Sequence, residues 1–143
     1  MRFAEVAFEP KHFEPARALW ENTEGVGLSD ADDEVNLLRY LARNPRTSFV
    51  AMRGTTLVGT ILCGHDGRRG LIHHLAVAAA HRRQGLGRAL LSAGLAALHA
   101  EGIAKCHLLV FGHNESGLAF WSAAGAQMRD ELRLLSLRTQ SAA

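Results

Sequence analysis

Three arginines and two glycines lie close together where an apolar run leads into a helical pattern. They are Arg82, Arg83, Gly85, Gly87 and Arg88. The first amides of a helix have no partner within it, and the helix dipole favours negative charge there. Arginines at such an end oppose the dipole unless an anion binds, so the cluster predicts a site for phosphate or pyrophosphate.

The spacing of this cluster separates it from two other phosphate-binding motifs. The chain reads R-x-x-G-x-G here, which matches neither the dinucleotide fingerprint G-x-G-x-x-G nor the P-loop G-x-x-x-x-G-K-[ST]. The spacing therefore argues against a nucleotide-binding α/β domain. One structural alternative remains, in which the glycines only allow the helix to pack closely on a sheet.

Composition limits the class of protein. With 143 residues, 48% of them hydrophobic and 21% charged, the chain is typical of one globular domain. A net charge of +2 is too small to indicate nucleic-acid binding. The two cysteines and eight histidines show no metal-ligand spacing, so we predict no metal. No signal peptide or apolar run of membrane-spanning length is evident, which favours a cytoplasmic protein with no membrane partner.

Hydrophobic periodicity places the cluster within an α/β domain. Helices are expected over residues 12–22, 31–43, 86–100 and 114–124. Strands are expected over residues 3–8, 48–53, 57–64, 71–77, 106–111 and 128–137. Residues 139–143 are expected to fray. This order predicts a single domain over residues 1–143 with one central mixed sheet.

Two motifs in this order resemble those of the GNAT superfamily of acyl-CoA N-acyltransferases. The first is Arg82-Arg83-Gln84-Gly85-Leu86-Gly87, which fits Q/R-x-x-G-x-G/A after the fourth strand. The second is Asn114 followed by Ala119-Phe120-Trp121-x-x-x-Gly125. The resemblance covers nearly the whole chain and is greatest to small bacterial acetyltransferases of unassigned substrate. It implies a GNAT-like fold with about six to seven strands, about four helices, and a cleft between splayed strands 71–77 and 106–111.

The resemblance also implies how acetyl-CoA would bind. The pantetheine arm would lie along one strand, and the pyrophosphate would lie on the turn that follows it. The implied contacts come from Leu75, Ala76, Val77, Arg82, Arg83, Gln84, Gly85, Leu86, Gly87, Arg88, Asn114, Phe120 and Trp121. A primary amine of a small molecule or peptide would attack the thioester directly through a tetrahedral intermediate, with a backbone N–H holding the oxyanion.

Two neighbouring histidines are the candidate catalytic residues. Histidine titrates near neutral pH and can accept the proton of an attacking amine. Strand alternation predicts that His73 and His74 face opposite sides of the sheet, with His73 beside Leu71 and Leu75. His73 also matches the position where arylalkylamine acetyltransferases of the family carry a histidine. We expect His73 to be the base and His74 the fallback; the alternative is that both are structural.

Trp121 is a departure from the family pattern. Many relatives carry a tyrosine there that protonates the leaving thiolate, which an indole N–H cannot do near neutral pH. Water, Ser116, Ser122 or the single tyrosine, Tyr40, could serve, or no acid is needed. The departure also supports an alternative function, a non-catalytic acyl-CoA-binding or regulatory module on the same fold.

The first two helices are implied by the resemblance to form the acceptor side. Trp20, Glu21 and Glu24 are the candidate contacts, because acidic residues attract a cationic amine. The acidic residues at 32–34 are expected to be a solvated helix start. The class of amine stays open. Dimers are common in the family, so a homodimer is also expected.

Overall fold

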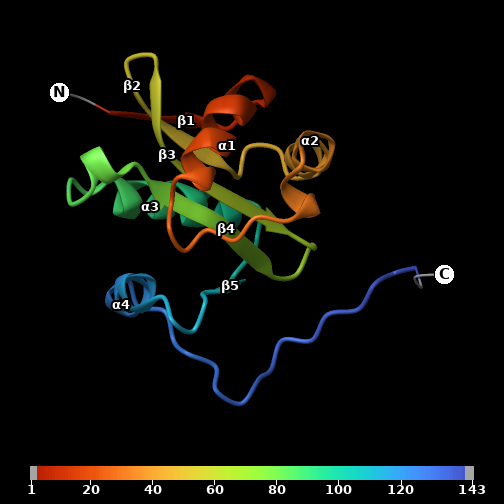
Figure 1. The fold of residues 1–143 in the computed structure, drawn as a ribbon. Coiled ribbons are helices and arrows are strands. Elements are labelled where there is room, and N and C mark those ends of the chain that lie inside the picture. The colour runs from red at the N-terminus through yellow and green to blue at the C-terminus, as the bar shows by residue number, and fades with distance from the viewer. Residues whose placement is uncertain (1–2, 141–143) are drawn as a thin grey trace.

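The computed structural model describes residues 3–140, which form a mixed sheet with helices on both faces (Figure 1). The strands are β1 (Ala4–Ala7), β2 (Phe49–Arg53), β3 (Thr56–His65), β4 (Gly70–Val77) and β5 (Cys106–Leu108). The α-helices are α1 (Phe13–Glu21), α2 (Glu34–Arg43), α3 (Leu86–Ala100) and α4 (Glu115–Ala123). Short 3-10 turns cover Pro10–His12, Asp30–Asp32 and Ala79–His81. The four expected helices are confirmed, and α3 has the predicted bounds.

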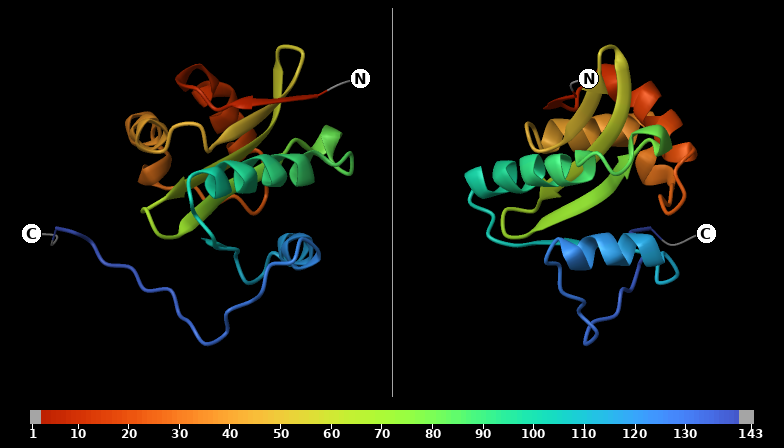
Figure 2. Two further views of the ribbon diagram at one scale, coloured as in Figure 1. Left: turned by 180° about the vertical axis from the view of Figure 1, so that it is seen from behind. Right: turned by 90° about the vertical axis from the view of Figure 1, so that its left-hand side faces the viewer.

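The sheet follows the chain order β1-β2-β3-β4-β5. Its strands pair antiparallel except β4 and β5, which are parallel and are joined through α3. Helices α1 and α2 cover one face and α3 covers the other, as two further views show (Figure 2). Helix α4 lies beyond the β5 edge, so the chain forms two layers of helix around one sheet.

Two apolar cores form because side chains of each strand alternate between the faces. On the first face Trp20 of α1 and Leu37 of α2 pack with Val50 and Leu62 of the sheet. On the second face Leu90 of α3 packs with strand residues such as Ile61 and Cys63. Gly94 lets α3 approach the sheet closely, since a Cβ there would lie 2.6 Å from the Cys63 Sγ atom.

Replacing Gly94 by alanine is therefore expected to destabilise the fold. Alanine favours a helix interior by up to about 1 kcal/mol over glycine. Overpacking a well-filled core costs about 1–3 kcal/mol, which outweighs that gain. Denaturant unfolding should show a smaller cost of Gly94→Ala in a Cys63→Ala background, because the contacted sulfur is gone. Equal costs in both backgrounds would contradict the packing argument.

A β-bulge interrupts β4 at the two histidines. His73 pairs with Leu62 and Ala76 pairs with Thr60, so one residue of β3 faces two residues of β4. His74 takes a positive φ of 46°, which a non-glycine residue rarely adopts. The extra residue shifts the alternation of β4 by one position from here to its end.

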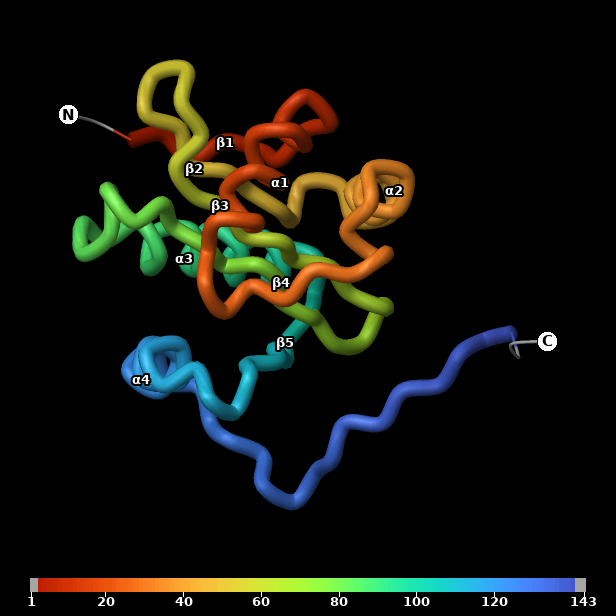
Figure 3. The backbone as a smooth tube through the Cα atoms, in the orientation of Figure 1, coloured from red at the N-terminus to blue at the C-terminus, as the bar shows by residue number. Residues whose placement is uncertain are grey.

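The sheet is smaller than the sequence predicts. The expectation of about six to seven strands is wrong, because the described residues form five. The predicted strand over residues 128–137 is not formed; residues 126–140 have no helix or strand and run away from the sheet (Figure 3). The strand predicted over 106–111 is only Cys106–Leu108. Alternating leucines favour an extended chain, but a strand also needs a neighbour to pair with.

Residues 141–143, part of the segment expected to fray, lie outside the described residues. Within residues 3–140, no helix has the length and hydropathy needed to cross a bilayer.

Candidate active site

Strands β4 and β5 pair at one end and then separate. Their ladder joins Gly70, Leu71 and Ile72 to the three residues of β5, whereas β4 continues to Val77. From His73 to Val77, β4 therefore has no strand neighbour on the β5 side among the described residues. The splay spans about 13 Å of β4, at roughly 3.3 Å per residue, along which main-chain groups lack a strand partner on the β5 side; the His74 and Val77 carbonyls accept side-chain hydrogen bonds instead.

Both candidate bases lie at the point where the splay begins. The bulge turns His73 and His74 to the same side of the sheet, with ring centroids 6.2 Å apart in an edge-to-face arrangement. The prediction that alternation separates them is wrong, and so is the grouping of His73 with Leu75. Leu75 and Val77 instead pack on the α3 face.

A buried carboxylate holds the His74 ring. Nε2 of His74 lies 2.6 Å from Oδ1 of Asp32, and both side chains are nearly buried. The other Asp32 oxygen accepts the Ser29 N–H at 3.0 Å. With Asp32 ionised, Nε2 carries the proton and Nδ1 is the acceptor of the neutral ring. The expectation that Asp32 belongs to a solvated helix start is wrong, because the 3-10 turn before α2 directs it inward.

The backbone of His74 is also fixed. Thr60 Oγ1 donates to the His74 carbonyl at 2.8 Å and accepts from Trp20 Nε1 at 2.8 Å. The Trp20 ring lies 4.7 Å from the His74 ring, centroid to centroid, and is only 1% exposed. Trp20 thus supports His74 from the core and offers an acceptor no exposed surface. Sequence reasoning missed Asp32 and Thr60, because their distance along the chain from His74 gives no local pattern.

His73 has a different environment from its neighbour. Burial first, and then the charge of His74, lower the pKa of His73, while Asp32 opposes the shift. The Tyr40 ring from α2 contacts His73 edge-to-face at 6.1 Å. No hydrogen-bond partner of the buried Tyr40 hydroxyl is found within residues 3–140, and burial raises the pKa of Tyr40 above the ordinary value for tyrosine. His73 is therefore mostly neutral near neutral pH, as a proton acceptor must be.

The other end of β4 leads into the arginine-rich turn. Arg83 and Gly85 take left-handed φ values of 62° and 82°, and a Cβ on Gly85 would meet open space. The first helical bond of α3 joins the Ala89 N–H to the Gly85 carbonyl at 3.0 Å, so the preceding amides lie before the helical ladder. The side chains of Arg82, Arg83, Gln84 and Arg88 are exposed, and the side chain of Leu86 is buried.

Two of these arginines also hold the surrounding chain. Arg82 Nε donates to the Val77 carbonyl at 3.1 Å, which ties the turn to the end of β4. Arg88 Nη2 donates to the Ala123 carbonyl at the end of α4 at 3.1 Å. The result is a concentration of amide and guanidinium donors about one strand length from the histidines.

Helix α4 brings the second sequence motif to this turn. A Cβ on Gly87 would lie 3.3 Å from the Phe120 ring, so α3 and α4 meet closely there. Trp121 packs edge-to-face on Phe120 at 5.3 Å and against the core on the α3 face. Asn114 caps α4 by accepting the Gly117 N–H at 3.0 Å.

The loop after α1 closes on the start of α4. A Cβ on Gly25 would lie 2.7 Å from the Asn114 side chain, and one on Gly27 would lie 2.8 Å from Phe111. Glu21 and Glu24 beside this loop are exposed, and Glu21 forms an ion pair of 3.4 Å with Arg17. The structure thus places Glu21 and Glu24, the two acidic candidates for acceptor contacts, on the exposed surface beside this loop; we call this surface the acidic rim.

Comparison with known proteins agrees with this arrangement. The model of the acetyltransferase (GNAT) family matches residues 13–126. An acetyltransferase of Sodalis glossinidius is 31% identical over 131 residues, 92% of each chain.

Solved structures share the fold at lower identity. The PaiA N-acetyltransferase of Thermoplasma acidophilum, in complex with coenzyme A, has a TM-score of 0.77 at 20% identity, covering 91% of this chain and 92% of its own. Naa50 of Arabidopsis thaliana, in complex with a bisubstrate analogue of coenzyme A and the peptide MVNAL, has a TM-score of 0.71 at 22% identity, covering 91% and 86%. These structures share the fold, and the match of the family model together with the Sodalis glossinidius relative shows that the chain belongs to the GNAT acetyltransferase family.

Proposed function

We propose that this protein transfers an acetyl group from acetyl-CoA to a primary amine of a small molecule or peptide. The observation that carries the proposal is the arrangement along β4: two histidines at the start of the splay, and a donor-rich turn at its end. A thioester cosubstrate with a diphosphate at its far end is chemically suited to both. PaiA and Naa50, which share the fold, are known in complexes with coenzyme A or an analogue of it.

The turn before α3 fits a diphosphate. Left-handed φ values such as those of Arg83 and Gly85 occur in the concave amide clusters that bind anions. The helix dipole and the exposed guanidiniums add positive potential at the same place. The pantetheine arm would then run along residues 75–77 of β4, where the splay leaves main chain available. Phe120, Trp121 and Asn114 would border the cosubstrate from α4.

His73 is the proposed base of the reaction. The amine nitrogen forms a bond to the acetyl carbon, the carbon–sulfur bond breaks, and the sulfur leaves with the electron pair. His73 takes the proton released from the amine, which its lowered pKa allows near neutral pH. Solvent supplies the proton for the thiolate, since Trp121 has no acidic proton. His74 is the second candidate base, because Asp32 orients its ring.

The acidic rim is the proposed acceptor side. Glu21 and Glu24 are exposed near the loop that contacts Phe111 and Asn114. Carboxylates there would attract an ammonium group to the open end of the splay. This charge favours a cationic amine, and both small polyamines and peptide N-termini meet that requirement.

A second candidate function is a non-catalytic acyl-CoA-binding module. Its support is the tryptophan where many relatives carry a tyrosine. Both functions require cosubstrate binding, and they differ in turnover.

Release of free thiol from acetyl-CoA is the test of the proposed function. We expect thiol release above the amine-free control with at least one class from a panel of amino acids, polyamines, aminoglycosides and peptides. A thermal-shift titration with coenzyme A measures binding separately. Stabilisation by coenzyme A with no turnover on any amine would support the module, and the absence of both would contradict both functions.

A further inference from the structure

A row of aromatic rings joins helix α2 to helix α1 through the two histidines of β4. The Tyr40 ring of α2 contacts the His73 ring with a centroid distance of 6.1 Å. His73 also contacts the His74 ring at 6.2 Å, and both contacts are edge-to-face. His74 in turn contacts Trp20 of α1 at 4.7 Å. The His73 imidazole is therefore in contact with two rings, one from its own strand and one from α2.

The α1 end of this row is held by hydrogen bonds. Nε2 of His74 lies 2.6 Å from Oδ1 of Asp32, and Trp20 Nε1 donates to Thr60 Oγ1 at 2.8 Å. Thr60 Oγ1 also donates to the His74 carbonyl at 2.8 Å. Both the ring and the backbone of His74 are thus fixed, so His73 packs on a neighbour that keeps one position.

The Tyr40 end of the row is anchored to β3. Asn44, which ends α2, donates its N–H to the Tyr40 carbonyl at 3.0 Å and accepts the His65 N–H of β3 at 3.0 Å. The Tyr40 hydroxyl lies beside Gly64 of β3, where a Cβ would come within 2.8 Å of it. Glycine at this position therefore allows the ring to approach the sheet closely. The Tyr40 ring is held between α2 and β3 while it contacts His73.

Tyr40 acts on His73 without a charge of its own. Burial raises the pKa of the Tyr40 hydroxyl, so it stays neutral near neutral pH and is a weaker acid than an ordinary tyrosine. This argues against Tyr40 as the proton donor to the leaving thiolate. Burial is the largest cause of the lowered pKa of His73, followed by the charge of His74, while the charge of Asp32 opposes the shift. The Tyr40 ring contributes to that burial because it contacts the imidazole.

We propose that Tyr40 is a positioning residue for His73: its ring covers part of the imidazole, excludes water from it and holds it in one orientation. This inference rests on the proposed function, in which His73 takes the proton of the attacking amine. Tyr40 acts only through His73. An imidazole kept from water favours its neutral form, which is the form that accepts a proton. Tyr40 thereby sets the lowest pH at which the base works.

Titration of the histidine rings by NMR tests this in the free protein. Tyr40→Ala should raise the pKa of His73 by about half a pH unit or more, because water then reaches the ring. Tyr40→Phe keeps the aromatic ring and should leave the titration unchanged. The His73 signals are identified as those lost in His73→Gln. Tyr40→Leu keeps apolar volume on α2, so it should give a smaller rise in the same direction even if Tyr40→Ala does not fold.

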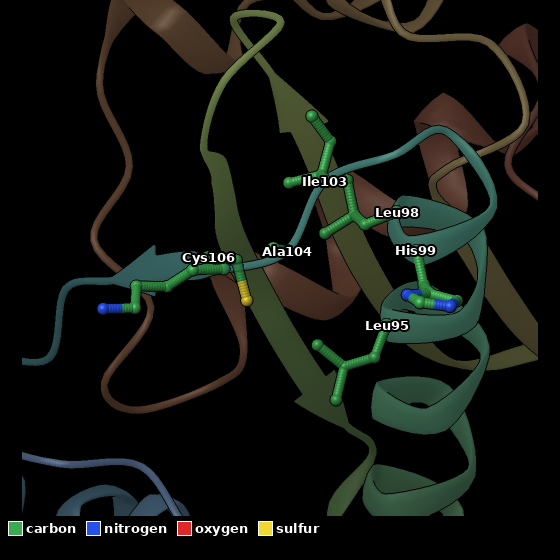
Figure 4. Close-up of a pocket in the computed structure, with 7 residues that line it drawn as sticks. Leu95, Leu98, His99, Ile103, Ala104 and Cys106 are labelled. Atoms are coloured by element: carbon green, nitrogen blue, oxygen red, sulfur yellow. The ribbon is translucent and has the colours of Figure 1, made fainter.

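The opposite face of the sheet supplies the controls. Leu95 and His99 of α3 line a cavity of about 150 Å³ together with Ile103 and Cys106 (Figure 4). Leu95→Ala removes an apolar side chain from that face, whereas Tyr40 packs on the face covered by α1 and α2. Leu95→Ala should therefore leave the His73 titration unchanged. His99 is the internal reference, because its signals should titrate alike in every variant.

The pH profile of thiol release tests the consequence for catalysis. In Tyr40→Ala the acid limb of kcat/KM should move to higher pH together with the His73 titration. A loss of rate that is equal at every pH would mean that Tyr40 is only structural and would overturn the inference. An unmoved His73 titration in both Tyr40→Ala and Tyr40→Leu would overturn it as well. A raised His73 titration without acetylation of any amine would support positioning by Tyr40 and contradict the proposed function alone.

Discussion

Replacing His73 by glutamine is expected to lower kcat/KM for the acceptor amine by about 100-fold near pH 6.5, the lower end of the range for loss of a general base. At that pH most amines are protonated, so a base is needed to expose the nucleophile. The deficit should shrink as the pH rises toward the pKa of the amine, because free amine then becomes abundant. Initial rates of thiol release across a pH series measure this.

The direction of the pKa shift gives the sign of the pH dependence. A lowered pKa keeps the His73 ring neutral to a lower pH than an ordinary histidine. The acid limb of the wild-type profile should therefore lie below the usual histidine value of about 6.5. That limb should disappear in His73→Gln.

His74→Gln is the matched control, since it removes the ring held by Asp32 and keeps His73. An unchanged pH profile in His73→Gln, with the acid limb lost in His74→Gln, would reassign the role to His74. A limb retained in both variants would mean that both histidines are structural.

Charge reversal at Arg83 is expected to raise the KM for acetyl-CoA about 10- to 100-fold, with a smaller change in kcat. Hydrogen bonds to charged groups contribute about 1.5–3 kcal/mol, and 1.4 kcal/mol is tenfold in affinity. Arg83→Glu replaces such a donor by a charge that repels a diphosphate. A second variant, Arg83→Gln, removes the charge without reversing it. Both variants place a non-glycine side chain at the positive φ of Arg83, so the backbone effect is the same in the two.

Arg68→Glu is the control for net charge. Arg68 is exposed in the turn before β4, at the opposite end of that strand from Arg83. The Arg68→Glu variant should leave the KM for acetyl-CoA unchanged within twofold. Added salt should reduce the difference between wild type and Arg83→Glu, because screening weakens exposed charge interactions. Equal effects at both positions, or no effect at Arg83, would remove the turn from the cosubstrate site.

The sequence determined most of the local features around the site. Helical periodicity placed α3 with its observed bounds, and the glycines and arginines before it predicted an anion site at its start. Both motifs are short-range patterns, in which backbone preference and helix-end chemistry act within a few residues. For the same reason the family resemblance could be found from the order of two motifs.

Only the tertiary structure decided how the histidines are arranged. Two residues of β4 face one residue of β3, a register that depends on both strands, and this turns His73 and His74 to one side against the simple alternation. The partner of His74 comes from Asp32, 42 positions away along the chain, and Trp20 belongs to the core where the sequence indicated an acceptor contact.

The strand predicted over residues 128–137 shows the same limit of local patterns. Residues 128–137 have the composition of a strand, and the sequence correctly indicates an extended chain. Whether that chain becomes a strand depends on backbone groups that another segment must supply, and those groups lie outside any local pattern. Short-range chemistry thus determined the helices and the turn predicted to bind an anion, while pairing between distant segments determined the sheet, the bulge and the geometry of the candidate base.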